Sequence, residues 1–296
     1  MPKDRRTEHL GLLFGGLGVL SFSFTVPITR AVVPVFGGWT VGIGRAVGAA
    51  LLAAVLLRLS GVAWPRRELR GKLLLVAGGV VLGFPLFSAL ALEFVPASRA
   101  AIVIGVLPIA TALAATLLHG ERPSRAFWMA ALGGLATVLA FAFVTGAGGR
   151  PEPADGLLLL AVASAAIGYA EGASLSRELG GWQTISWALV LSLPVTLPVS
   201  GYALWQHGVV EASLSSYLGF GYLTTVSMFL GFFFWYAGIA RGGAARVGQL
   251  QLMQPVLTLC WSALFLGERI GTAAIVTAGL VILFVLLTRR APIQRG

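Results

Sequence analysis

Apolar stretches of about 20 residues follow one another along almost the whole chain, separated by short polar segments. As a helix, each stretch is long enough to cross the ~30 Å hydrocarbon core of a bilayer. With 57% hydrophobic and 11% charged residues, the chain has too few polar side chains to cover a soluble surface. The sequence therefore predicts an all-α polytopic membrane protein with ten transmembrane helices, at about residues 10–29, 39–59, 72–92, 97–119, 126–145, 156–176, 184–206, 217–240, 244–266 and 272–288.

Lysine and arginine fall mainly into alternate segments between the predicted spans. If the N-terminus is cytoplasmic, 16 of the 21 basic residues lie inside, 4 lie outside, and Arg45 lies within the second span. Because basic residues stay on the cytoplasmic side, both termini are predicted to be cytoplasmic in a multi-pass inner (plasma) membrane protein. The net charge of +10 is then a sign of orientation, and no nucleic-acid partner is expected. Arg45 is expected to snorkel outward, the alternative being that it holds a carboxylate.

One motif occurs twice, half a chain apart. Pro108 precedes Gly120-Glu121-Arg122, and Pro255 precedes Gly267-Glu268-Arg269, with 147 residues between the two copies. Each half holds five predicted spans, and an odd number turns the second half over in the membrane. The sequence thus predicts two inverted five-helix repeats, residues 1–148 and 149–296, which provide the two states that alternating access requires. The alternative is a duplicated bundle with no transport role.

Several motifs resemble those of the EamA-type exporters of the drug/metabolite transporter superfamily. They are the five-plus-five spans, the triplets at 97–99 and 244–246 that open the fourth and ninth spans, and the Gly-Glu-Arg that closes each. Residues 234–243 and 254–257 are similar to YddG-type exporters of aromatic and other amino acids, although Gly168 stands where that group has a tryptophan. The resemblance implies a secondary transporter exporting amino acids, in a broad neutral range including large apolar and aromatic ones. Another small metabolite or a lipophilic cationic drug is the alternative cargo.

The two prolines of the repeated motif lie at equivalent depths. Pro108 and Pro255 are each the twelfth residue of their span, roughly 17 Å from its start and near the bilayer midplane. Each frees the backbone carbonyl four residues earlier, which a membrane tolerates where a cavity or ligand satisfies it. Both are therefore candidate hinges, the alternative being a packing kink.

Polarity around these prolines differs between the halves. Gln251 and Gln254 flank Pro255, whereas the equivalent positions beside Pro108 are Ile104 and Leu107. Amides are costly at this depth unless they are paired. A site shared by both halves would bind an amphipathic small molecule. The further candidates for the substrate pathway are Ser21, Phe84, Phe87, Tyr169, Trp235 and Tyr236. For the aromatic residues among them, the alternative is that they face lipid and anchor the helices.

Few ionisable groups enter the spans. Glu171 is a candidate for proton coupling, or else it pairs with Arg177 at the interface. Proton exchange and facilitated diffusion both stay open. The helix-end residues of the repeated motif are predicted to form ion pairs on opposite faces, which act either as loop locks or as gates, namely Glu121 with Arg122 and Glu268 with Arg269.

The residue types that an intramembrane enzyme needs are sparse. The three histidines lie at span ends in different parts of the chain, and the sequence has no zinc-protease or P-loop motif. We expect no enzymatic activity, cofactor or metal, and as partners only a small-molecule substrate and the lipid bilayer. Glycines four residues apart suit close packing inside a monomer as readily as dimerisation: Gly11/Gly15, Gly44/Gly48, Gly79/Gly83, Gly168/Gly172 and Gly238/Gly242.

Overall fold

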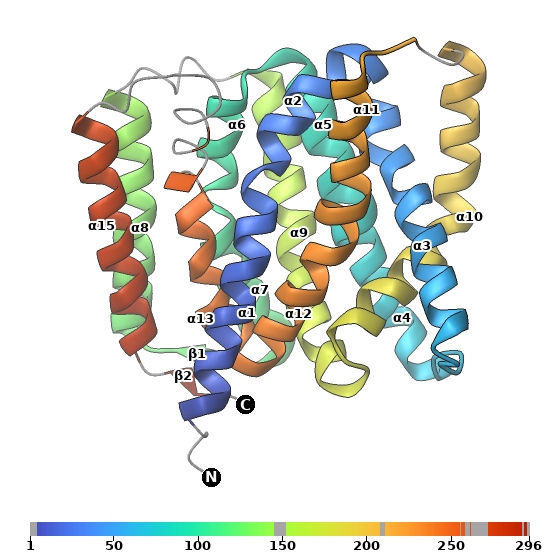
Figure 1. The fold of residues 1–296 in the computed structure, drawn as a ribbon. Coiled ribbons are helices and arrows are strands. Elements are labelled where there is room, and N and C mark those ends of the chain that lie inside the picture. The colour runs from blue at the N-terminus through green and yellow to red at the C-terminus, as the bar shows by residue number, and fades with distance from the viewer. Residues whose placement is uncertain are drawn as a thin grey trace.

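The computed structural model describes residues 5–144, 152–207, 211–254, 256–257, 261, 272–291 and 293–294, which are almost entirely helical (Figure 1). Within these ranges, two shorter apolar helices cover Arg125–Phe141 and Gly279–Thr288. The ninth predicted span lies partly outside the described residues, so the total of ten stays a prediction. In the described part of the chain, seven helical segments are long and apolar enough to cross a membrane: His9–Phe36, Thr40–Leu59, Arg67–Phe94, Arg99–His119, Pro153–Glu178, Gly181–Gln206 and Leu214–Gly242.

Several of these segments are built from two or three shorter helices. In the first half the elements are α1 (Arg5–Ser23), α2 (Thr25–Phe36), the π-helix η1 (Thr40–Gly44), α3 (Arg45–Leu59), α4 (Arg67–Val76), the π-helix η2 (Ala77–Gly83), α5 (Phe84–Phe94), α6 (Ala97–Ile104), α7 (Leu107–His119), β1 (Arg122–Pro123) and α8 (Arg125–Val144). In the second half they are α9 (Pro153–Glu178), α10 (Gly181–His207), α11 (Leu214–Tyr222), the π-helix η3 (Leu223–Leu230), α12 (Gly231–Gly242), α13 (Ala244–Gly248), the 3₁₀-helix η4 (Gln249–Leu252), α15 (Thr272–Arg290) and β2 (Ile293–Gln294).

Prolines account for two of the helix interruptions. A proline has no N–H to donate to the carbonyl four residues earlier, so a helix readily ends there. Accordingly α1 ends at Ser23, four residues before Pro27, and α6 ends at Ile104, four residues before Pro108. Pro108 then lies in the first turn of α7, where the missing donor costs least.

Other interruptions recur at, or within one residue of, the 147-residue offset. The π-helix η3 begins at Leu223, 146 residues after η2 begins at Ala77, and the helices that follow them begin 147 residues apart, at Phe84 and Gly231. Figure 1 shows the segment from α4 to α5 rising through the bundle, whereas the segment from α11 to α12 descends. The two segments therefore share their pattern of breaks and run in opposite directions.

Glycines set the closest helix contacts. A Cβ on Gly238 of α12 would lie 2.5 Å from the backbone nitrogen of Gly15 in α1. A Cβ on Gly79 of η2 would lie 2.5 Å from the carbonyl oxygen of Ser164 and 2.9 Å from Gly168 Cα in α9. The glycine pairs read from the sequence thus bring helices of the same chain together.

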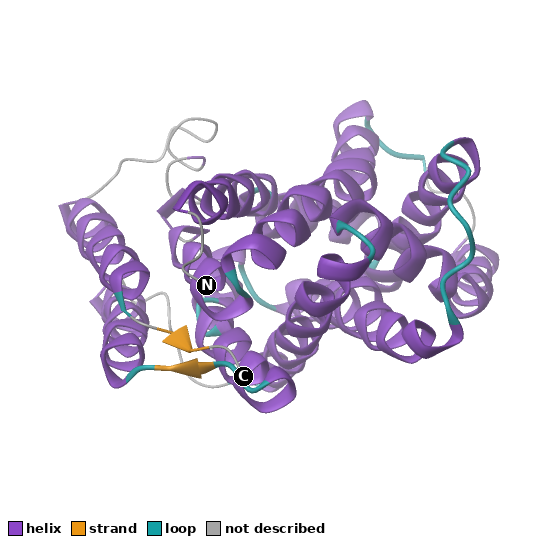
Figure 2. Cartoon of the chain, turned by 90° about the horizontal axis from the view of Figure 1, so that it is seen from below, coloured by secondary structure: helices purple, strands orange, loops and turns teal. Residues whose placement is uncertain are grey.

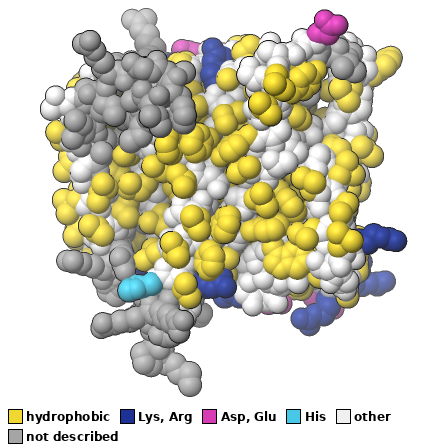
Figure 3. Space-filling view, in the orientation of Figure 1, with side chains coloured by type: hydrophobic (Ala, Val, Ile, Leu, Met, Phe, Trp, Pro, Cys, Tyr) yellow, Lys and Arg dark blue, Asp and Glu magenta, His cyan; other side chains and the backbone are white. Residues whose placement is uncertain are grey.

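The ends and the middle of the bundle differ in chemistry. Hydrophobic side chains cover the middle in Figure 3, while basic side chains gather mainly toward the lower end, where α1 begins. Seen from below, α8 and α15 pack together at one edge, and β1 lies beside β2 (Figure 2). These two short strands are antiparallel, with Arg122 opposite Gln294. An apolar belt between polar ends matches a bilayer.

Candidate functional site

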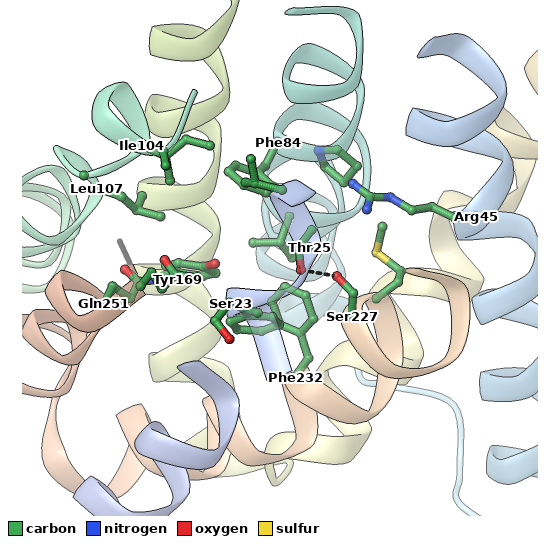
Figure 4. A pocket seen from close by; sticks show the side chains of 18 residues that line it. Ser23, Thr25, Arg45, Phe84, Ile104, Leu107, Tyr169, Ser227, Phe232 and Gln251 are labelled. Atoms are coloured by element: carbon green, nitrogen blue, oxygen red, sulfur yellow. Dashed lines mark hydrogen bonds between the residues drawn. The ribbon is translucent and has the colours of Figure 1, made fainter. Parts of the chain in front are cut away.

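A pocket lies where the interrupted helices meet inside the bundle (Figure 4). It touches the α1–α2 break, the α6–α7 break, both longer π-helices and η4. Broken helices expose backbone groups that only a cavity or a ligand can satisfy inside a membrane. The lining residues are Phe22, Ser23, Thr25, Val26, Arg45, Val80, Phe84, Pro85, Ala101, Ile104, Gly105, Leu107, Tyr169, Ser227, Met228, Phe232, Gln251 and Gln254.

Ten of these lining residues form five pairs that are 147 residues apart, one member from each half. The pairs are Phe22 with Tyr169, Val80 with Ser227, Pro85 with Phe232, Ile104 with Gln251 and Leu107 with Gln254. Equivalent positions of the two repeats therefore face one cavity, as expected of a site on the axis that relates them. Sequence reasoning found five of the ten, namely Tyr169, Ile104, Leu107, Gln251 and Gln254. Applying the same offset to every candidate would also have found Phe22.

Four of the residues predicted for the pathway line this pocket: Phe84, Tyr169, Gln251 and Gln254. Gln251 is buried and lies beside Tyr169 (Figure 4). Its neighbour on η4, Gln249, donates a hydrogen bond from Nε2 to the carbonyl of Pro108 at 3.2 Å. The candidate hinge of the fourth span is thus tied to the ninth. Pro255 lies outside the described residues.

The other four predicted pathway residues lie outside the pocket. Phe87 is half-buried, and Ser21 donates its hydroxyl to the carbonyl of Leu17 at 3.0 Å. Trp235 is fully buried behind Tyr169, with ring centroids 5.1 Å apart, so it supports the wall of the pocket.

Tyr236 is directed into α9 rather than into the pocket. Its hydroxyl donates to the carbonyl of Gly168 at 3.1 Å, and its ring fills the space beside Gly172. A Cβ on Gly172 would lie 2.0 Å from Tyr236 Cε1. The glycine at position 168, where the resembling exporters have tryptophan, thus belongs to a tightly packed helix crossing.

Polar residues that sequence reasoning missed cluster at the α1–α2 break. Thr25 Oγ1 and Ser227 Oγ are 2.8 Å apart and share a hydrogen bond between α2 and η3 (Figure 4). Ser23 Oγ accepts a hydrogen bond from Trp261 Nε1 at 2.8 Å. Pro27, four residues after Ser23, was the available signal, because it places a helix break beside these hydroxyls.

Arg45 does not snorkel to the surface, contrary to the sequence-based expectation. Its side chain is 0% exposed and lines the pocket, extending from α3 toward Thr25 and Phe84 (Figure 4). Arg45 directly follows the π-helix η1. The snorkelling expectation came from the position of Arg45 only six residues into the predicted span, whereas the structure buries this position in the pocket lining.

The predicted gate residues make different contacts from those expected. Glu121 is buried and accepts a hydrogen bond from the backbone N–H of Ala245, at the start of α13, at 3.2 Å from Oε2. Arg122 is exposed, and the described residues include no ion pair between it and Glu121. Glu268 and Arg269 lie outside the described residues. Glu121 therefore fastens the end of the fourth span to the start of the ninth.

An ion-pair cluster fastens the other end of the bundle. Arg99 at the start of α6 binds Asp155 at 2.6 Å and Glu152 at 3.1 Å. The two carboxylates also cap α9, since Glu152 and Asp155 form a capping box. This cluster joins the fourth span to the first helix of the second half.

Glu171 pairs with a histidine rather than with Arg177. His119 Nε2 lies 3.5 Å from Glu171 Oε1, and the glutamate side chain is 8% exposed. Arg177 is exposed. The pair joins the end of α7 to α9 and lies outside the lining of the pocket.

Comparison with known proteins agrees with this arrangement. The sequence profile of the EamA-like transporter family matches the chain twice, over residues 9–143 and 153–290. The chain belongs to the EamA-like transporter family. This family forms part of the drug/metabolite transporter superfamily, and the protein is accordingly a multi-pass membrane protein, consistent with the inner membrane.

Relatives of this EamA-like protein carry little further information on substrate. The uncharacterized transporter YdeK of Bacillus subtilis (strain 168) is 43% identical over 283 residues, which cover 95% of this chain and 97% of YdeK. The uncharacterized transporter YcbK of the same strain is 30% identical over 82 residues, 28% of this chain and 23% of YcbK. One solved crystal structure of a protein has a TM-score of 0.72 at 20% identity, covering 95% of this chain and 98% of that one. That likeness concerns the fold alone.

Proposed function

We propose that this EamA-like transporter is a secondary carrier that exports amino acids across the inner membrane by alternating access between two inverted repeats. The cargo is a broad neutral range that includes large apolar and aromatic amino acids. The observation that carries the proposal is the pocket at the helix interruptions, where five pairs of equivalent positions meet. A site on the axis between two repeats stays in place while the halves rock around it.

The chemistry of the lining supports an amphipathic cargo. Ile104 and Leu107 offer an aliphatic wall, and Gln251 and Gln254 offer amides from the opposite half. The alternative cargo is another small metabolite with both polar and apolar parts. A lipophilic cation suits the pocket poorly, because the buried positive charge of Arg45 repels it in a medium of low dielectric constant.

Contacts at the two ends of the fourth span support a gating role. Arg99 holds one end to Asp155, and Glu121 holds the other to Ala245. Alternating access requires one such closure to open while the other is kept. The halves of a single chain supply both closures, so a monomer suffices.

Reconstituted protein tests the proposal. Proteoliposomes are loaded with unlabelled amino acid, and entry of the same labelled amino acid is measured for a panel of neutral side chains. We expect saturable counterflow for several of them, strongest for large apolar ones. Protein-free liposomes and the lipid-facing variant Leu197→Ala, at a side chain that is 58% exposed, serve as controls. Absence of saturable flux for the whole panel would reject amino-acid export.

Proton coupling through Glu171 and His119 is the second part of the proposal. The carboxylate of Glu171 lies 3.5 Å from the imidazole of His119, and both residues lie on helices that contribute to the lining of the pocket. We expect flux in wild-type vesicles to rise when a pH gradient is imposed, and this response to vanish in Glu171→Gln. The exposed-site variant Glu178→Gln on the same helix is the control. A gradient response that survives in Glu171→Gln would remove this residue from coupling, and no response in wild type would favour facilitated diffusion.

A further inference from the structure

Arg45 is a buried cation without a protein partner. Its side chain is 0% exposed, and none of its three guanidinium nitrogens has a hydrogen-bond partner within the described part of the chain. A buried charge is costly unless it is paired and hydrogen-bonded. The guanidinium nonetheless lines the pocket, at the start of α3. The unpaired guanidinium of Arg45 therefore faces the space that cargo would occupy.

The rest of the lining supplies no negative charge. Among the described residues, no aspartate or glutamate lines the pocket. The nearest hydroxyls in Figure 4, on Thr25 and Ser227, hydrogen-bond to each other. Phe84 and Met228 add apolar surface to the same lining. An anion that neutralises Arg45 is therefore expected to come from the cargo.

We propose that Arg45 binds the carboxylate of the cargo, and that this carboxylate, rather than the amino group, is the charged feature that the pocket requires. The inference rests on the proposed transport function and narrows its substrate class to amphipathic carboxylic acids. A guanidinium suits a carboxylate because its planar N–H groups can form two parallel hydrogen bonds. The apolar part of the cargo then lies toward Ile104 and Leu107.

The amino group of an amino acid has no matching carboxylate among the described residues of this lining. An ammonium would be left to hydroxyls, the amides of Gln251 and Gln254, and aromatic faces such as that of Tyr169, which bind cations less strongly than a carboxylate does. The pocket should therefore accept an acid that lacks the amine. It should reject an amine that lacks the acid, because that ligand brings a second positive charge to Arg45.

Three ligands that share a phenylethyl group test whether the pocket requires the carboxylate or the amine. Phenylalanine has both groups, 3-phenylpropionate lacks the amine, and phenethylamine lacks the carboxylate. Binding to purified full-length protein is measured by the ligand-dependent rise in its melting temperature. We expect phenylalanine and 3-phenylpropionate to stabilise the protein at similar concentrations and phenethylamine to give no stabilisation at a hundredfold higher concentration. Equal stabilisation by phenethylamine and 3-phenylpropionate would overturn the inference, as would stabilisation by neither acid.

Variants of Arg45 separate binding from folding. Arg45→Met removes the charge at similar length, and Arg45→Lys keeps a charge without the planar fork. For Arg45→Met we expect the affinity for 3-phenylpropionate to fall about a hundredfold, while the ligand-free melting temperature is unchanged or higher. Arg45→Lys should retain intermediate affinity. Arg58→Met, at an exposed arginine on the same helix, is the matched control and should bind normally.

Each outcome bears on one of the two proposals. Undiminished binding of 3-phenylpropionate to Arg45→Met would overturn the role of Arg45. A variant that failed to fold would mean that Arg45 serves packing, and the three-ligand series on wild type would then decide the substrate class. Binding of 3-phenylpropionate without counterflow of any amino acid in the panel would reject amino-acid export and leave the carboxylate site standing. If phenethylamine inhibited phenylalanine counterflow and 3-phenylpropionate did not, amino-acid export would stand and the carboxylate site at Arg45 would be rejected.

Discussion

The two halves of the pocket agree in their backbone and differ in their chemistry. Near the 147-residue offset, η2 matches η3, α5 matches α12, and α6 matches α13 and η4 together. The side chains at these matched positions are nevertheless unlike. In four of the five lining pairs, the first half contributes an apolar residue and the second half a polar one: Phe22 and Tyr169, Val80 and Ser227, Ile104 and Gln251, Leu107 and Gln254.

This difference indicates what each property serves. In the proposed carrier, helix breaks at equivalent positions would allow the two halves to move in the same way, as alternating access requires. Side chains that differ between the halves would give the proposed cargo a polar side and an apolar side. Arg45 is the exception, because the first half supplies this charge and none of the described second-half residues in the lining is charged. Replacing second-half residues by their first-half counterparts therefore tests two things separately: the helix arrangement that the halves share, and the side chains in which they differ.

The largest effect is expected from removing the amides. In the double variant Gln251→Ile, Gln254→Leu, each glutamine becomes its first-half counterpart. Each neutral hydrogen bond contributes about 0.5–1.5 kcal/mol, so kcat/KM for amino-acid flux should fall roughly tenfold to a hundredfold. The measurement is initial-rate counterflow with folded protein verified by size-exclusion chromatography. The control is the apolar exchange Ile104→Val, Leu107→Met, for which flux should stay close to wild type. Unchanged kinetics in the glutamine double variant would mean that polarity on this side plays no part in recognition.

Much of the helix arrangement shared by the two halves could be predicted from the sequence. Apolar windows and the repeated proline motif indicated helical spans, their pairing at the 147 offset and the contrast of Gln251 and Gln254 with Ile104 and Leu107. These features depend on residue type and spacing alone, and all four residues line one pocket.

The remaining features depend on how helices pack against one another. Arg45 is buried because other helices pack around the start of α3, and hydropathy along one segment cannot indicate that packing. Tyr236 reaches α9 because Gly168 and Gly172 leave room for it, which is a property of a pair of helices rather than of one segment. Glu121 was paired with its sequence neighbour, whereas its partner lies 124 residues further along the chain. Such long-range contacts have no local signal.

The packing of α12 against α1 can be disturbed at Gly238. Its first-half counterpart is Ala91, which is buried and already carries a Cβ. In Gly238→Ala the new Cβ would lie 2.5 Å from Gly15 N and 2.9 Å from Gly11 O, both backbone atoms that cannot rotate away. We expect a net loss of about 2 kcal/mol, since overpacking exceeds the helix-propensity gain of about 1 kcal/mol.

Thermal unfolding in detergent measures this loss, which should lower the melting temperature by about 5 °C. Gly16→Ala in α1 is the matched control, because nothing lies within 4 Å of the position that its new methyl group would occupy, and its melting temperature should be unchanged or slightly higher. Equal melting temperatures for the two variants would mean that α1 and α12 can move apart to accommodate the new methyl group. Close packing at Gly238 would then not be required for stability.

A smaller effect is expected at the hydroxyl pair. Ser227→Val introduces the residue of its counterpart Val80 and leaves Thr25 Oγ1 without the partner that lies 2.8 Å away. An unsatisfied buried hydroxyl should lower the free energy of unfolding by about 1–2 kcal/mol. Adding Thr25→Val removes the orphaned group, so the double variant should recover part of this loss. A double-mutant cycle of unfolding free energies measures the coupling. Strictly additive losses would mean that the pair contributes no mutual stabilisation.

The smallest effect is expected at Tyr169, where the two halves differ by one hydroxyl. Tyr169→Phe reproduces Phe22 and preserves the ring contacts with Trp235 and Phe232, at centroid distances of 5.1 and 6.2 Å. We expect KM for amino-acid flux to rise about twofold to fivefold with little change in kcat, because one neutral hydrogen-bonding group is lost. Tyr202→Phe, at an exposed tyrosine far along α10, is the control. A hundredfold loss would place the hydroxyl in direct and essential contact with cargo. No change would confine the polar side of the pocket to its amides and to Ser227, and the contrast between the halves would then rest on three pairs rather than four.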